Sequence, residues 1–277
     1  MKHFDGRVAA ITGAASGIGR SLALEMARRG AHLALSDVDD EGLAETARRA
    51  QRTGLTVTTA RVDVADRGEV EAWAEAVVGD HGGVNLIFNN AGVALGAPVE
   101  TMAYEDLEWL MGINFWGVVH GTKTFLPHLK AAGEGHVVNI SSIFGLAGIP
   151  SQSAYNAAKF AVRGFTEALR VELDIERCGV SATSIHPGGI KTNIARNARM
   201  GAGMEDLGDT DPEQARRDFE KMFITSAEKA AGEIVRAVQL DRRRALVGPD
   251  AKAFDLLVRA SPTLAQRIIA RGGARAL

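Results

Sequence analysis

The glycine-rich segment Thr12–Gly19, Thr-Gly-Ala-Ala-Ser-Gly-Ile-Gly, constrains the fold more than any other part of the chain. It follows the apolar run Val8–Ile11 and leads into a helical pattern that Gly30 ends. A strand, a glycine-rich turn and a helix N-terminus form an anion site in this order. Backbone N–H groups and the positive helix end face the anion, and the absent side chains let it come close. A plain tight turn is the alternative for the glycines alone, but with this strand and helix around it the segment predicts a dinucleotide site.

Apolar strand-like runs alternate with helical patterns along the whole chain. This alternation predicts an α/β fold, a doubly wound parallel sheet of about seven strands with helices on both faces. We expect the strands at Val8–Thr12, His32–Ser36, Thr56–Val62, Leu86–Phe88, His136–Ile140, Val180–Ile185 and Arg244–Val247.

The organisation predicted for the chain is a single dinucleotide-binding catalytic domain over residues 1–250. Within it, residues 200–223 are glycine-rich and then charged, which suggests a substrate loop or lid. Residues 251–277 form a helical C-terminal extension that carries apolar residues and several arginines.

Composition excludes several classes of protein. A net charge of -2 gives no electrostatic footprint for nucleic acid, and no apolar run is long enough to span a membrane. Cys178 is the single cysteine, so no intrachain disulfide can form and we expect a cytoplasmic protein. The seven histidines are scattered without ligand spacing, so we expect no metal site.

A second pattern lies in the middle of the chain. Tyr155 and Lys159 are four residues apart, one helical turn, and Ser142 precedes the tyrosine by thirteen residues. A lysine ammonium beside a phenol favours the phenolate and lowers its pKa from about 10. Such a tyrosine can exchange a proton with an alcohol or carbonyl oxygen, which Ser142 could hold by a hydrogen bond. The alternative for the tyrosine and lysine alone is a solvated helix face.

The two patterns together resemble those of the short-chain dehydrogenase/reductase family, in its compact single-domain type. The resemblance runs from about Gly6 to about Pro249, and the glycines have that family's spacing, with three residues between the first two. Further matching segments, in the family's order, are Asn89-Asn90-Ala91-Gly92, Asn114, Ser141-Ser142 and Pro187-Gly188-Gly189-Ile190-Lys191-Thr192.

The resemblance implies a Rossmann-type fold and assigns roles to four residues. Tyr155 would be the acid/base, and Ser142 would orient the reacting oxygen. Lys159 would lower the pKa of the tyrosine and bond the nicotinamide ribose. Asn114 would distort its helix locally and hold a water that links Lys159 to solvent, although a mid-helix asparagine can also be a packing polar group.

The choice of cofactor depends on Asp37, at the end of the second expected strand. A carboxylate there can accept both adenosine ribose hydroxyls of NAD and would repel the 2′-phosphate of NADP. Val38 and Asp39 offer no cation, and Arg20 beyond the glycine turn is a weak candidate. The alternative is that Asp37 caps the next helix.

The resemblance adds further cofactor contacts. Asp63 would bond the adenine amino group, and Val64 would contact the ring through its backbone. The Ile190 backbone and the Thr192 hydroxyl would hold the carboxamide. The full set expected to bind NAD is Gly13, Ser16, Gly17, Ile18, Gly19, Asp37, Asp63, Val64, Asn90, Ala91, Gly92, Tyr155, Lys159, Pro187, Gly188, Ile190 and Thr192.

The substrate is less constrained by the sequence. Its expected contacts are Ser142, Phe144, Ile149, Gln152, Tyr155, Gly188 and Ile194. Most side chains in these segments are apolar, Leu146, Ile190 and Met200 included, and no arginine lies within residues 144–152. We therefore expect a hydrophobic or neutral secondary alcohol or ketone as substrate, although the same apolar residues could be core.

The expected function is an NAD-dependent alcohol dehydrogenase or carbonyl reductase. The alternatives are an NADPH-dependent carbonyl reductase, which Asp37 disfavours, a non-catalytic NAD-binding sensor or scaffold, and a membrane-surface protein that uses the arginine-bearing tail. By resemblance we also expect a homodimer or homotetramer, formed through two long aromatic-bearing helices over Met102–Lys130 and Gln152–Glu176.

Overall fold

The protein is built on a seven-stranded parallel sheet with the strand order β3-β2-β1-β4-β6-β7-β11. The computed structural model describes residues 1–203 and 223–276. The strands are β1 (Val8–Thr12), β2 (His32–Asp37), β3 (Val57–Arg61), β4 (Leu86–Asn89), β6 (Gly135–Ile140), β7 (Val180–Pro187) and β11 (Arg244–Val247). The predicted fold class and the seven strands are confirmed, with each boundary within two residues of its expected place.

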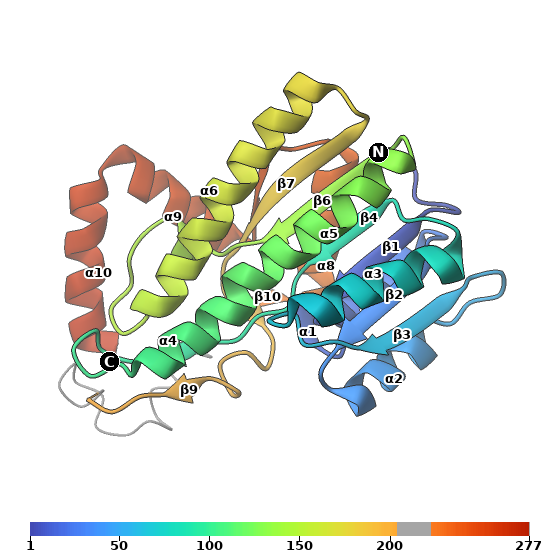
Figure 1. The fold of residues 1–277 in the computed structure, drawn as a ribbon. Helices are drawn as coiled ribbons and strands as arrows, with labels where there is room; N and C mark the ends of the chain where they lie inside the picture. Colours follow the sequence, from blue (N-terminus) through green and yellow to red (C-terminus); the bar gives the residue numbers. More distant parts are fainter. Residues whose placement is uncertain (204–222, 277) are drawn as a thin grey trace.

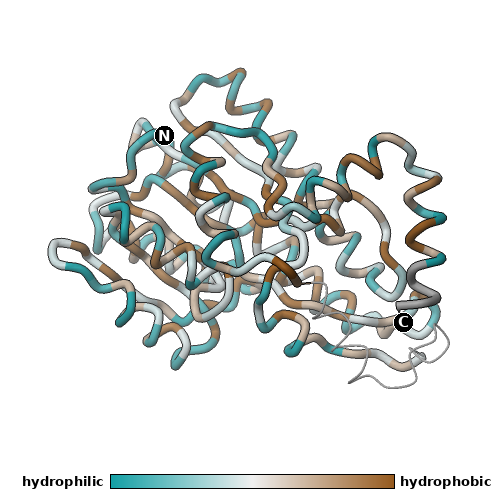
Figure 2. Tube along the Cα trace, turned by 180° about the vertical axis from the view of Figure 1, so that it is seen from behind, coloured by the Kyte–Doolittle hydropathy of each residue, from teal (hydrophilic) through white to brown (hydrophobic). Residues whose placement is uncertain are grey.

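Helices cover both faces of this sheet (Figure 1). One face packs against α1 (Gly17–Arg28), α2 (Asp40–Ala50) and α8 (Ala227–Gln239). The other face packs against α3 (Arg67–His81), α5 (Gly117–Ala131) and α6 (Ser153–Glu176). Figure 2 shows hydrophobic residues along the strands between these layers.

The two layers explain why the strands read as continuous apolar runs. Successive strand residues point to opposite faces, so Ile11 lies in the α1 core while its neighbour Ala10 lies in the α3 core. Both faces are buried, and therefore polar alternation is absent from the central strands. Each of the two cores is therefore built from apolar side chains of the sheet and of the helices that cover it.

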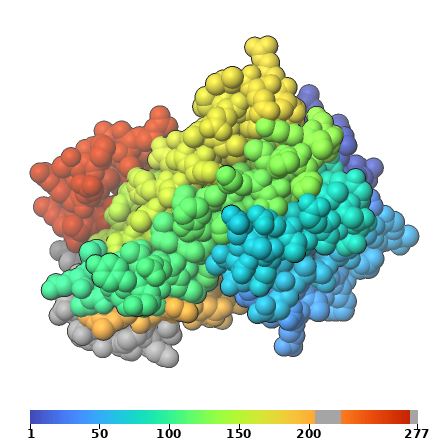
Figure 3. Space-filling model, viewed as in Figure 1, coloured from blue at the N-terminus to red at the C-terminus, as the bar shows by residue number. Residues whose placement is uncertain are grey.

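The chain from 104 to 131 is one nearly continuous helical segment. It comprises α4 (Tyr104–Met111), a π turn η1 (Gly112–Trp116) and α5. The C-terminal extension forms α9 (Pro249–Ala260) and α10 (Pro262–Ala276), so the predicted helical tail is present and begins two residues earlier than expected. Figure 3 shows these two helices, in red, beside the yellow-green part of α6.

Short elements complete the described chain. β5 (Leu95–Gly96) pairs with β9 (Arg199–Met200), and β8 (Ile190–Lys191) pairs with β10 (Thr225–Ser226). A 3-10 turn, η2 (Ile143–Gly145), follows β6. Most of the expected substrate loop, residues 204–222, lies outside the described residues. Across 1–203 and 223–276, no helix has both the length and the apolar character that crossing a membrane demands.

The strand order places the site. β1 and β4 are neighbours, yet the chain leaves them in opposite directions across the sheet, toward β2 and toward β6. In open parallel sheets a crevice forms at this switch point, outside the carboxyl ends of the strands. The expected functional segments after β1, β2, β3, β4, β6 and β7 therefore all lie along one edge.

Candidate active site

The glycine turn between β1 and α1 has the geometry of a phosphate cradle. Gly13 and Gly17 have φ values of +65° and +53°, which side-chain-bearing residues rarely adopt. A Cβ on Gly19 would overlap the Gly13 carbonyl, so only glycine fits there. Ser16 is the N-cap of α1 but forms no capping bond with its side chain, which leaves the first backbone N–H groups of the helix open to an anion. These residues fit a dinucleotide pyrophosphate.

Thr12 and Asn90 fix this turn to the loop after β4. The Thr12 hydroxyl accepts hydrogen bonds from the Asn90 and Ala91 backbone N–H groups at 2.9 and 3.1 Å. The Asn90 amide donates to the carbonyls of Thr12 and Gly13 at 2.9 and 3.2 Å. The structure thus brings the predicted Asn90–Gly92 segment against the glycine turn. Thr12 is a positioning residue that sequence reasoning missed, since a strand-end threonine has no local signature.

Asp37 lies at the carboxyl end of β2 and faces the glycine turn. Its carboxylate accepts from the Ala15 backbone N–H at 2.9 Å and from Asp39 N–H at 3.1 Å. The helix that follows is capped by Asp39 instead, whose side chain accepts from Gly42 N–H at 3.0 Å. The alternative that Asp37 is the cap of α2 is therefore wrong.

The Arg20 side chain is held below the glycine turn by hydrogen bonds of its guanidinium. Its guanidinium donates to the Thr46 hydroxyl at 2.8 Å, to the Gly42 carbonyl at 3.1 Å and to the Ala15 carbonyl. These bonds join α1 to α2, so the side chain is a structural clamp. Neighbouring Val38 is 53% exposed and carries no charge.

Asp63 and Val64 follow β3 on the same edge of the sheet. The Asp63 carboxylate accepts from the Ala65 backbone N–H at 2.9 Å, which shapes the turn. The Val64 side chain is buried against Gly117, where a Cβ would overlap it, and its carbonyl meets His120 Nδ1 at 3.0 Å. Both residues lie where the resemblance expects adenine, and their contacts to a base stay a prediction.

Ser142 and Tyr155 lie beside each other. Ser142 lies just after β6 and Tyr155 in the first turns of α6, near enough for a hydrogen bond from Ser142 to act on the pKa of the phenol. The Ser142 oxygen already accepts from Phe144 N–H at 3.1 Å, so its own hydrogen is the one available to the phenol oxygen. The Phe144 ring meets the Tyr155 ring edge-on, with the centroids 5.7 Å apart. The predicted pair is thus assembled beside an apolar wall.

Lys159 lies one turn along α6 and is 3% exposed. Its ammonium is 5.4 Å from the centroid of the Tyr155 ring and donates to the Ile140 carbonyl at 3.0 Å. Burial lowers the pKa of Lys159 to about 8, because a charged amine loses its hydration there.

The prediction that Lys159 lowers the pKa of Tyr155 is wrong for this geometry. Burial raises the pKa of Tyr155 to about 12, and only the hydrogen bond from Ser142 opposes it. The ammonium is turned toward the Ile140 carbonyl, away from contact with the phenol oxygen. The phenol is therefore protonated at neutral pH.

Asn114 lies in the π turn η1 and is fully buried. The expected local distortion of the helix is thus present, as often occurs at functional sites. Its amide oxygen accepts from Val93 N–H at 2.8 Å and its amide nitrogen donates to Val93 O at 2.8 Å. The same oxygen and Lys159 Nζ both lie close to Gly92, at 3.1 and 3.7 Å from the position of an added Cβ. Asn114 therefore ties the loop after β4 to the lysine side of the site, and its proposed water stays a prediction.

The segment Pro187–Thr192 follows β7 and faces the glycine turn from across the crevice. The Thr192 methyl group lies 3.1 Å from where a Gly17 Cβ would stand. The Ile190 backbone pairs with Thr225, while its side chain is 5% exposed and belongs to the core. The structure therefore contradicts the expectation that the Ile190 side chain lines a substrate pocket, because strand pairing turns it inward.

The expected substrate residues lie at different places. Gln152 and Met200 approach Gly96, with the Gln152 amide nitrogen 3.5 Å and the Met200 sulfur 3.0 Å from an added Cβ there. Ile149 and Ile194 are half-buried. Leu146 is buried beside a polar cavity next to Arg163, which favours the alternative that its side chain belongs to the core.

Asn156 shapes the loop that carries these residues, and sequence reasoning missed it. Its amide oxygen accepts from Ile149 N–H at 3.0 Å. Its amide nitrogen donates to the carbonyls of Phe144 and Ala147 at 2.7 and 2.8 Å. One buried side chain thus fixes residues 144–149 next to Tyr155. The signal available in the sequence is that Asn156 directly follows Tyr155.

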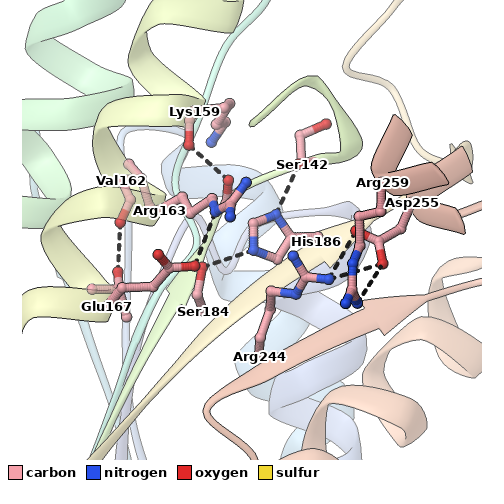
Figure 4. A network of polar contacts seen from close by, with 12 residues as sticks. Ser142, Lys159, Val162, Arg163, Glu167, Ser184, His186, Arg244, Asp255 and Arg259 are labelled. Atoms are coloured by element: carbon pink, nitrogen blue, oxygen red, sulfur yellow. Dashed lines mark hydrogen bonds and ion pairs between the residues drawn. The ribbon is translucent and has the colours of Figure 1, made fainter. Parts of the chain in front are cut away.

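His186 supports Ser142 from below (Figure 4). Its Nδ1 lies 3.0 Å from the Ser142 carbonyl and its Nε2 lies 3.0 Å from the Ser184 hydroxyl. A carbonyl only accepts, so Nδ1 carries the hydrogen. Burial lowers the pKa of His186 to about 4, which keeps the ring neutral. His186 is therefore a positioning residue for Ser142.

A polar cavity of about 450 Å³ lies beyond His186 in the same view. Arg244 donates to both Asp255 oxygens at 2.8 and 2.9 Å, and Arg163 donates to Glu167 at 2.9 Å. The arginines are paired with carboxylates, and the cavity contains neither Tyr155 nor the glycine turn. This cavity is therefore separate from the predicted catalytic residues Ser142 and Tyr155.

Comparison with known proteins identifies the family. The family model described as short chain dehydrogenase matches residues 7–203. The oxidoreductase SadH of Mycobacterium tuberculosis is 50% identical over 277 residues, covering 99% of this chain and 98% of that protein. Levodione reductase of Leifsonia aquatica is 36% identical over 83% of this chain and 84% of its own length.

One solved structure has a similar fold. A short chain dehydrogenase/reductase from Burkholderia phymatum in complex with NAD has a TM-score of 0.86 and 32% identity, covering 95% of this chain and 96% of that chain. The fold and the site together define an oxidoreductase that binds a nicotinamide cofactor. The chain belongs to the short-chain dehydrogenase/reductase family.

Proposed function

We propose that the protein is an NAD-dependent oxidoreductase that interconverts a secondary alcohol and a ketone, with Tyr155 as acid/base. The single observation that carries this is the juxtaposition of Ser142, Tyr155 and Lys159, with the lysine ammonium 5.4 Å from the tyrosine ring centroid, at the edge of the sheet that holds the glycine turn. Residues Asn114, Ser142, Tyr155 and Lys159 are the proposed catalytic set.

The protein residues position a carbonyl and supply its proton. NAD, when bound, supplies the hydride chemistry. Ser142 can turn its hydroxyl hydrogen from the phenol to the substrate oxygen. With a pKa of about 12, Tyr155 holds its proton at neutral pH and is ready to give it to the oxygen of a ketone. In the direction of alcohol oxidation it would have to lose that proton first, which a closer approach of the Lys159 ammonium would favour.

NAD is the proposed cofactor, over NADP. Support comes from Asp37, whose carboxylate lies beside the glycine turn at Ala15, and from Arg20, whose side chain is bound between α1 and α2 and does not face Asp37 as a phosphate partner would. The Burkholderia structure that this chain resembles contains NAD. A 2′-phosphate near Asp37 would be repelled by about 1 to 4 kcal/mol at a separation of about 4 Å.

A neutral, hydrophobic substrate is the proposed class. Phe144 offers its ring next to Tyr155, and Ile149 is half-buried in the loop that follows. One relative is named for reducing levodione, which agrees with a ketone substrate. The expected contacts Gln152, Gly188 and Ile194 remain proposals.

A homodimer or homotetramer is the proposed assembly. Trp116 of η1 and Phe160 of α6 are 52% and 42% exposed, and Val171 and Ile175 of α6 are exposed too. Large aromatic side chains left in water on neighbouring helices favour burial against another subunit.

Tyr155→Phe tests the proposed function. It removes only the phenolic oxygen, so turnover of a lipophilic alcohol and ketone panel should fall about 10²- to 10⁴-fold while NADH still binds. Near-wild-type turnover would refute the mechanism. A wild-type protein that binds NADH but turns over none of the panel would favour the alternative of a non-catalytic sensor or scaffold. A preference for NADPH would favour the alternative of an NADPH-dependent carbonyl reductase.

A further inference from the structure

The loop after β7, residues 188–192, is the one that the proposed function places beside the nicotinamide. It is hydrogen-bonded to residues far along the chain. Gly188 N–H donates to the Val247 carbonyl at 2.9 Å, after β11. The Gly189 carbonyl accepts from the Ile224 and Thr225 N–H groups, both at 3.1 Å. Gly189 N–H donates to the Asp250 carboxylate at 2.6 Å. Three of these four bonds join backbone to backbone, so Asp250 is the one side chain among them.

The Asp250 carboxylate is aimed out of its own helix. Asp250 lies in the first turn of α9, where an aspartate commonly bonds the free N–H groups of that turn. Here it crosses to the loop after β7, and it occupies the place that a Cβ of Gly188 would take. Its second oxygen is buried and finds no hydrogen-bond partner within the described residues. Burying a carboxylate oxygen without a hydrogen-bond partner costs free energy. We therefore interpret the contact of Asp250 with the loop as one that serves to hold the loop in place.

We propose that Asp250 is a positioning residue for the nicotinamide-binding loop, and that Gly188 is glycine because the Asp250 carboxylate fills its side-chain position. The proposal rests on the proposed function, in which this loop faces the nicotinamide. Removing the carboxylate frees Gly189 N–H and loosens the loop from α9. The residues that would bind the adenosine end of the cofactor follow β1, β2 and β3, and removing the carboxylate leaves their contacts unchanged.

Asp250→Ala tests the proposal by binding alone. The affinity for NADH, measured by fluorescence, should fall about 10- to 100-fold, the value of a hydrogen bond to a charged group. The affinity for ADP-ribose, which lacks the nicotinamide, should stay within about two-fold. Unchanged NADH affinity, or an equal loss for both ligands, would overturn the proposal. Asp250→Asn keeps an accepting oxygen and should lie between wild type and Asp250→Ala.

Glu233→Ala is the matched control. The Glu233 carboxylate accepts from Gly248 N–H at 3.2 Å, at the same end of α9, and within the described residues it forms no hydrogen bond with Gly188 or Gly189. It should leave the affinities for NADH and ADP-ribose unchanged. A loss of NADH affinity equal to that of Asp250→Ala would show a general effect of the α9 end and would contradict the proposal.

A double mutant tests the fit between the two residues. Gly188→Ala alone should weaken NADH binding, because its methyl group would overlap the carboxylate. In the Asp250→Ala background the same change should cost less than about two-fold, since the space is free. Additive losses would refute the steric part. Failure of the proposed function is distinguishable, because it would appear in the wild type itself, as no NADH binding or as NADH binding without turnover, whereas this proposal is judged by the change of each variant from wild type.

Discussion

Replacing Lys159 by methionine should remove activity and yet stabilise the protein at neutral pH. Methionine keeps the length and apolar stem of lysine without its charge. The ammonium lies in a site where burial lowers its pKa from 10.5 to about 8. That difference corresponds to about 3 kcal/mol of unfavourable free energy for the protonated form at pH 7. The lost bond to the Ile140 carbonyl would offset about 1 kcal/mol.

The pH dependence separates this cause from others. Between the folded pKa of about 8 and the unfolded value of 10.5, the unfolded chain binds more protons than the folded one. Wild-type stability therefore rises with pH in this window, by about 1 kcal/mol from pH 7 to pH 9. Lys159→Met lacks this contribution, so its advantage over wild type should shrink by the same amount.

Urea unfolding at pH 7 and pH 9 measures both effects, with turnover assayed in parallel. The exposed Lys191 supplies the control, and Lys191→Met should leave stability within about 0.5 kcal/mol at both values. A Lys159→Met variant that is less stable than wild type by the same margin at pH 7 and pH 9 would refute the reasoning, because the lysine would then carry no burial penalty.

Two further predictions follow from the site and the surface. Wild type should prefer NAD to NADP by about ten-fold or more in kcat/KM with one fixed substrate, as about 1 to 4 kcal/mol of repulsion at Asp37 implies, and Asp37→Ser should narrow the ratio. Adding Val38→Arg to Asp37→Ser should narrow it further through a new phosphate partner, whereas an unchanged ratio would locate selectivity elsewhere. Phe160→Glu should lower the mass seen by light scattering, because a charge replaces an aromatic on the exposed face of α6, and a wild type that is already monomeric would exclude the proposed assembly.

Much of the fold could be predicted because buried parallel strands leave a strong local signal. The run Val8–Ile11 is apolar on both faces, and a glycine-marked turn follows it. The two-residue strands β5, β8, β9 and β10 leave no such signal, since two residues cannot show a period. Their pairing depends on long-range contacts alone.

The site could be predicted in its membership but not in its electrostatics. Ser142, Tyr155 and Lys159 come together as their spacing and family resemblance indicate. The sign of the tyrosine pKa shift depends on how deeply the phenol is buried and on where the lysine amine points, and neither quantity is written in a spacing of four residues. The Asp250 contact was equally out of reach, because 61 residues separate it from Gly189.

The bonds that hold the loop after β7 also bear on how the chain becomes able to bind a ligand during synthesis. The phosphate cradle is complete once β1, α1 and β4 have been made. The far end of the crevice acquires its backbone partners only when residues 224–250 have left the ribosome. The matched family region ends at residue 203, so a fragment cut there would keep the cradle and lose every one of these partners. A boundary drawn by sequence similarity thus passes through the middle of the binding site.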